Sequence, residues 1–195
     1  MAKSFFRTAL MSGLVIAMTQ SVFAQKTADE LKAERQELQT ELKSEKTVSR
    51  EEKLAKLVEK EPKETSVQSI DGLAKTSSGV LAVVKSTNDV LAQYKREVTD
   101  NNDGEIDVTI HKAKLDDYVK LASDLASTST LIATGTEQLK GAQADAKNLS
   151  PLKAKPALSS VSFSTDALKL SGEEVALQIK LVNNLIATIK SSDNL

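Results

Sequence analysis

Residues 66–98 decide the fold of this chain, and their sequence is SVQSIDGLAKTSSGVLAVVKSTNDVLAQYKREV. Apolar side chains fall on a seven-residue spacing within them, at Ile70, Val84, Leu91 and Val98. This spacing places the side chains on one face of an α-helix, whereas a half-buried strand would alternate apolar and polar residues. Because an isolated helix cannot shield such a face from water, it must pack against other helices.

The C-terminal part of the chain repeats the pattern. Its apolar residues also recur every seven positions, at Val161, Leu168, Val175, Val182 and Ile189. A less regular stripe lies between the two, at Leu115, Tyr118, Val119, Ala122, Leu125, Ala126, Ile132, Ala133 and Leu139. We therefore predict an all-α fold, an antiparallel up-down bundle of about four long helices. The last three, near 66–98, 110–147 and 157–191, should form the core.

The first 24 residues have the features of a secretory signal peptide. Lys3 and Arg7 precede a mostly apolar run over 9–18, and small residues lead to a cleavage point after Ala24. The alternative is an uncleaved membrane anchor, but the run is shorter than the ~20 apolar residues of a spanning helix. No later segment is apolar enough to span a bilayer. We expect a periplasmic or secreted protein without a transmembrane span after cleavage.

Composition argues against several classes of function. The chain has no cysteine, which excludes disulfides and thiolate metal sites. Without Lys3 and Arg7, 24 basic residues remain against 27 acidic ones. The mature chain therefore lacks the basic excess that is typical of nucleic-acid binding. The single histidine, His111, is expected to be a surface or helix-start residue, not a metal ligand or catalytic base.

Residues 25–62 form a densely charged segment that precedes the bundle core of 63–195. A capping box at Thr27 and Glu30 predicts a helix near 28–46. A second box at Ser49 and Glu52 predicts another helix near 50–61, so the segment is two helices or one kinked helix. Two interpretations remain open: a loosely held fourth member of the bundle, or a partner-binding or self-associating coiled-coil arm.

Residues 100–107, DNNDGEID, interrupt the helical pattern with oxygen-bearing side chains. The candidates for a Ca²⁺ site are Asp100, Asn102, Asp103, Glu105 and Asp107. In an EF-hand register with Gly104 at position six, Ile110 would occupy position twelve, where a glutamate is needed. We therefore expect an ordinary polar turn in which Gly104 has a positive φ. Residues 106–110 would form a short extended piece, and Asp107 or Thr109 would cap the next helix.

Several local signals refine the expected helices. Thr65 and Gln68 form a capping box for the 66–98 helix, and Pro156 suits the first turn of the last helix. Gly72 and Gly79, seven residues apart, indicate a close crossing by another helix or, less favoured, a ligand groove. One continuous helix is expected over 110–147, with a kink near Gly135 as the alternative.

The acidic residues do not suggest a catalytic centre. Asp116 and Asp117, like Glu173 and Glu174, are sequence neighbours and should point to different faces, which leaves no carboxylate pair in the core. No nucleophile, phosphate-loop or dinucleotide motif is present, so we expect no catalytic residues, no cofactor and no enzyme.

Two classes of function remain. The first is a structural or protein-interaction module of the bacterial cell envelope, whose partner is another envelope protein or a second copy. The alternative is a periplasmic carrier that holds a small apolar ligand or lipid between its helices.

Overall fold

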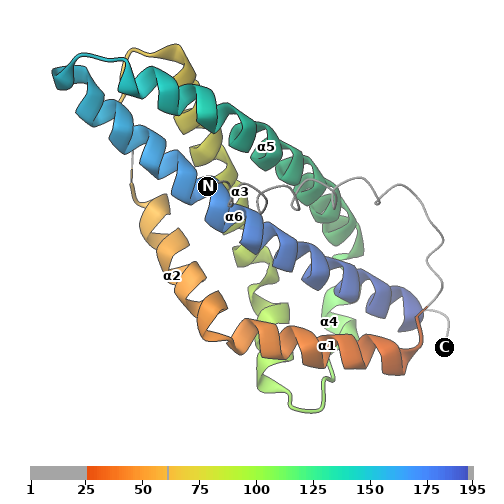
Figure 1. Ribbon diagram of the computed structural model, residues 1–195. Coiled ribbons are helices and arrows are strands. Elements are labelled where there is room, and N and C mark those ends of the chain that lie inside the picture. The colour runs from red at the N-terminus through yellow and green to blue at the C-terminus, as the bar shows by residue number, and fades with distance from the viewer. Residues whose placement is uncertain (1–25, 61, 193–195) are drawn as a thin grey trace, which may run out of the picture.

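The computed structural model describes residues 26–60 and 62–192 (Figure 1). These residues form six helices and no strand. The helices are α1 (Ala28–Lys43), α2 (Glu45–Val58), α3 (Gln68–Asp100), α4 (Val108–Lys112), α5 (Leu115–Lys147) and α6 (Pro151–Ser192). The signal peptide predicted over 1–24 lies outside the described residues.

The three long helices α3, α5 and α6 form the core, and each runs opposite to the one before it (Figure 1). α6 packs against each of the other five helices. The apolar residues on both seven-residue spacings are buried, from Ile70 to Val98 in α3 and from Val161 to Ile189 in α6. The prediction of an all-α fold with the last three long helices as its core is therefore confirmed.

The charged N-terminal segment is broken at Ser44, not near Ser49 as predicted. The Ser44 hydroxyl accepts a hydrogen bond from the Thr47 amide at 3.2 Å and thereby caps α2. Ser49 lies inside α2, so the predicted box with Glu52 does not start a helix. Both serines have helix-capping chemistry, but the extended backbone at Ser44 satisfies the end of α1 and the start of α2 together.

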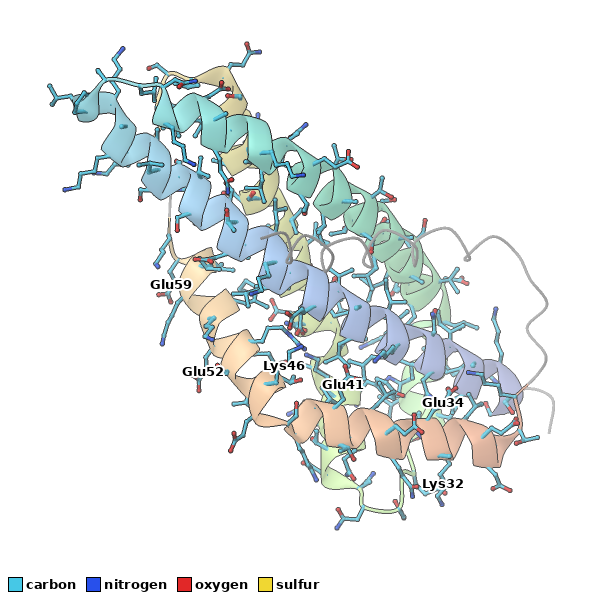
Figure 2. The ribbon with its side chains drawn as sticks, in the orientation of Figure 1. Lys32, Glu34, Glu41, Lys46, Glu52 and Glu59 are labelled. Atoms are coloured by element: carbon cyan, nitrogen blue, oxygen red, sulfur yellow. The ribbon has the colours of Figure 1, made fainter. Side chains whose placement is uncertain are left out.

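α1 and α2 lie across α3 and α6 (Figure 1). Their inner sides bury five leucines, Leu31, Leu38, Leu42, Leu54 and Leu57. Charged side chains occur along both helices, including the labelled Lys32, Glu34, Glu41, Lys46, Glu52 and Glu59 (Figure 2). In this structure the segment is thus a bent fourth member of the bundle that buries a narrow apolar seam.

α3 begins differently from the prediction. Its N-cap is Val67, which has no side-chain capping bond, so the expected box between Thr65 and Gln68 does not form. The Asp71 carboxylate instead accepts hydrogen bonds from the Thr65 amide and hydroxyl, both at 2.8 Å. Ser66 between them has a φ of 60°, a left-handed conformation that this turn imposes on a non-glycine residue.

The segment after α3 is helical where an extended piece was expected. Val108–Lys112 forms the short α4, capped as predicted by the Asp107 carboxylate, which accepts from the Thr109 amide at 3.0 Å. A break at Lys114 separates α4 from α5, so the predicted helix 110–147 is two helices. α5 is continuous through Gly135.

α6 starts six residues earlier than predicted. Pro151 is its first residue, and the Ser150 carbonyl accepts from the Lys153 and Ala154 amides. Pro156 therefore lies inside the helix, where it cannot donate to the carbonyl four residues earlier. That carbonyl belongs to Leu152, which is 92% exposed, so water can replace the missing donor.

The close helix crossing occurs at a different glycine from those expected. A Cβ at Gly72 or Gly79 would meet nothing within 4 Å, so the prediction of a crossing there is wrong. A Cβ at Gly135 would lie 3.0 Å from a methyl carbon of Leu168. α5 therefore approaches α6 closely where Gly135 leaves room for Leu168.

Candidate functional site

A cluster of buried charges joins α2 to α3 and α6. The Glu174 side chain is fully buried in α6, and its Oε2 accepts a hydrogen bond from Arg50 Nε at 2.8 Å. Its Oε1 accepts from Lys95 Nζ at 3.2 Å. Two cations from different helices thus offset the cost of burying one carboxylate.

The cluster extends outward from Lys95. Lys95 Nζ also donates to Glu51 Oε1 at 2.7 Å and to Asn88 Oδ1 at 2.8 Å. Asn88 Oδ1 in turn accepts from Gln178 Nε2 at 3.0 Å. The buried cluster therefore reaches the protein surface at Glu51 and Asn88, between α2 and α3.

We expected no carboxylate pair in the core and did not foresee that one carboxylate, Glu174, is buried there. Glu173 is partly exposed at the edge of the same cluster, where its Oε2 lies 3.0 Å from Lys46 Nζ and 3.9 Å from Arg50 Nη1. A sequence signal for Glu174 did exist, because Ala167 and Leu181, seven residues before and after it, lie on the same buried helix face. Its partner Arg50 lies 124 residues away in sequence, so the ion pair could not be predicted.

A second polar cluster fastens α1. Arg35 is 5% exposed, and it donates from Nε to the Gly104 carbonyl at 2.6 Å and from Nη1 to Thr188 Oγ1 at 2.7 Å. Nearby, the Tyr94 hydroxyl donates to Asn184 Oδ1 at 2.7 Å. Burial raises the pKa of the Tyr94 hydroxyl far above its usual range. Both polar clusters hold the N-terminal helices on the core.

A groove of about 250 Å³ lies between α2 and α3, beside the first cluster. Its lining residues are Glu51, Leu54, Ala55, Val58, Glu59, Leu81, Val84, Lys85, Asn88 and Asp89. Five of them are apolar and three are acidic, against one lysine. Lys85 Nζ is paired with Asp89 Oδ2 at 2.7 Å, whereas the exposed Glu59 side chain forms no hydrogen bond or ion pair with another described residue.

One side of α5 faces solvent and has an unusual composition. Three members of the predicted α5 stripe, Val119, Ala126 and Ala133, are exposed and not in the core. Together with Ser123 and Thr130 they alternate at spacings of four and three residues, which is the spacing of a coiled-coil seam, although two of the five are hydroxyl residues. We call these five residues the α5 outer face.

The α5 outer face carries little polarity for a surface. No charged residue occurs between Asp124 and Glu137. The hydroxyl of Thr130 donates to the Ala126 carbonyl at 3.3 Å, within its own helix. A partner that covers this face would therefore desolvate few unsatisfied polar groups. Leu131, at its edge, is 51% exposed.

His111 is buried, so its interpretation as a surface residue is wrong. It is 1% exposed at the end of α4, with Nδ1 2.9 Å from the Tyr118 hydroxyl and Nε2 2.9 Å from Glu97 Oε2. The Tyr94 ring packs edge-on against it, with ring centroids 5.8 Å apart. Both ring nitrogens have partners, and these come from α3 and α5, which sequence position could not reveal.

The acidic calcium candidates are engaged in other contacts. Glu105 Oε1 lies 2.8 Å from Lys32 Nζ, and Asp103 Oδ1 accepts from the Glu105 amide at 3.0 Å. The Thr109 hydroxyl and amide donate to Asp107 and lower the pKa of its carboxyl. Gly104 has the expected positive φ, 72°.

The five calcium candidates are Asp100, Asn102, Asp103, Glu105 and Asp107. Across residues 26–60 and 62–192, no group of three or more His, Cys, Asp or Glu side chains is placed to hold a metal ion. The structure therefore does not bring these candidates together as a ligand set.

Comparison of the chain with protein-family models, curated proteins and solved structures finds no match. Within the described ranges, no helix has the length and apolar character needed to cross a bilayer. Among the described residues, the groove between α2 and α3 and the α5 outer face are two candidate binding surfaces.

Proposed function

We propose that this chain is an exported, non-enzymatic interaction module of the bacterial cell envelope, and that it docks an α-helix of a partner along the α5 outer face. The observation that carries the proposal is this exposed coiled-coil seam, uncharged from Leu125 to Thr136. The signal-peptide features of residues 1–24 support export to the periplasm or beyond.

The chemistry of the α5 outer face suits a helix better than an irregular segment. Small residues such as Ala126 and Ala133 allow two helix backbones to approach closely, and the seam repeats along the helix axis. The partner helix belongs to another envelope protein or to a second copy of this chain. The up-down bundle of α3, α5 and α6 acts as the rigid support for this seam.

A pull-down from the native envelope, with the mature chain as bait, tests the proposal. Replacing Ala126 and Ala133 together with glutamate places two carboxylates in the seam. We expect captured partner, or self-association in sedimentation, to fall about tenfold or more, because burying an unpaired charge costs several kcal/mol.

The matched control for the glutamate pair is Ala82→Glu together with Ala92→Glu, at two exposed alanines of α3. It should retain the partner. Equal capture by the seam variant and this control would end the proposal for α5, provided that circular dichroism shows both to be folded.

A second function, a carrier of a small apolar ligand, is favoured by the groove between α2 and α3. Leu54, Val58, Leu81 and Val84 give it apolar walls, and about 250 Å³ is enough for a small molecule or part of a lipid chain. The glycine pair that first suggested a groove, Gly72 and Gly79, does not line it.

A further inference from the structure

The groove between α2 and α3 combines an apolar interior with an acidic rim. Leu54 and Val84 in its walls are almost fully buried, at 4% and 2% exposure, and belong to the hydrophobic core. Ala55 and Val58 continue the apolar surface outward to solvent. An apolar occupant would therefore lie on the core itself, with one side open to water.

The size of the groove matches a single alkyl chain. A water-sized group takes up about 30 Å³, so about 250 Å³ holds roughly eight such groups. A methylene group is of similar size. One unbranched alkyl chain of about eight to ten carbons therefore fills this volume.

The charges around the groove select the sign of the head group. Three acids, Glu51, Glu59 and Asp89, line it against one lysine. Lys85 is already paired with Asp89, and the lysine behind Glu51 is shared with the buried Glu174. Glu59 alone has no partner among the described residues, so a cation at the rim would gain an ion pair without breaking one.

We propose that this groove binds a single-chain amphiphile with a cationic, ammonium-type head, the alkyl chain lying on Leu54, Leu81 and Val84 and the head beside Glu59. This inference rests on the carrier function and names its ligand class. It does not depend on the α5 outer face.

A calorimetric titration of the mature chain tests the proposal with three probes that share one tail: decylammonium, decanol and decyl sulfate, each below its micellar concentration. Decylammonium should bind most tightly and decyl sulfate least. The affinity for decylammonium should weaken as the salt concentration rises, because its head group is at the surface. Octylammonium should bind more weakly, by up to about fourfold for each methylene removed.

Two pairs of variants locate the site. Ala55→Phe fills the exposed end of the groove and should abolish binding, whereas Ala82→Phe, outside the groove on α3, should not. Glu59→Gln should weaken the affinity for decylammonium about two- to fivefold and leave the affinity for decanol unchanged. Glu52→Gln on the same helix, outside the groove, is the control for charge.

Three results would overturn the inference, with different consequences for the carrier. Equal binding of decanol and decylammonium, abolished by Ala55→Phe, would reject the cationic head but support the carrier. Tighter binding of decyl sulfate would reject the head-group assignment in the same way. No binding of any probe would reject the inference and the carrier together.

Discussion

Among single residues, Glu174 has the largest predicted effect on stability. Replacing it with glutamine leaves Arg50 and Lys95 without their shared buried carboxylate, although the shape is kept. Breaking a buried ion pair by removing one partner typically costs about 3–5 kcal/mol. We expect a fall of that size in the free energy of unfolding, measured by urea denaturation.

Glu41→Gln is the matched control for Glu174→Gln, since the Glu41 side chain is 38% exposed and pairs at the surface with Lys180, outside the buried cluster. Its substitution should change the free energy of unfolding by less than about 0.5 kcal/mol. Indistinguishable urea midpoints for the two variants would show that the buried cluster does not stabilise the fold.

Tyr94 should make the protein sensitive to alkaline pH. Burial raises the pKa of its hydroxyl, Arg35 lowers it, and Glu97 and Glu34 raise it further. The folded chain therefore keeps this proton at a pH where the unfolded chain, with a tyrosine pKa of about 10, has lost it. The contribution of Tyr94 to stability is complete below about pH 10 and is lost as the pH rises towards its folded pKa.

The measurement is the free energy of unfolding between about pH 9 and 12, for the wild type and Tyr94→Phe. The wild type should lose stability faster, by at most about 1.4 kcal/mol per pH unit. Lysines titrate in both proteins, so the difference between the curves isolates Tyr94. Parallel curves would contradict the prediction.

At the scale of elements, the sequence was most informative where a stripe contained large residues. Ile70, Leu91 and Leu168 lie on broad apolar faces, and these faces are buried as predicted. The stripe of α5 was assigned partly to the wrong side. The alanines of α5 distinguish its faces poorly because their side chains are small. Two neighbouring pairs, Tyr118 with Leu125 and Val119 with Ala126, both have a seven-residue spacing, so the spacing alone could not show which pair is buried.

Helix ends and polar partners were harder to predict because they depend on competing or distant contacts. Ser44 and Ser49 offer similar capping chemistry, and only the bend towards α3 and α6 selects Ser44. The groove could not be predicted for the same reason. Its walls come from α2 and α3, and the sequence left open whether the N-terminal segment packs on the bundle.

At the scale of the whole molecule, α1 and α2 should be indispensable to the fold. Deleting residues 26–60 from the mature chain removes five buried leucines and uncovers Glu174. Each Leu→Ala change in a core costs about 2–5 kcal/mol, whereas a domain has only about 5–15 kcal/mol in total. The truncated chain should therefore lack a cooperative thermal transition in circular dichroism.

The control for this deletion keeps the packing and cuts only the chain. A protease site introduced into the loop between α2 and α3 allows the intact protein to be nicked after folding. If the buried contacts hold α1 and α2 in place, the nicked protein should melt cooperatively near the temperature of the uncut protein, while the deletion should not. A truncated chain that melts like the full-length protein would show instead that α1 and α2 are an arm, and that α3, α5 and α6 are stable without them.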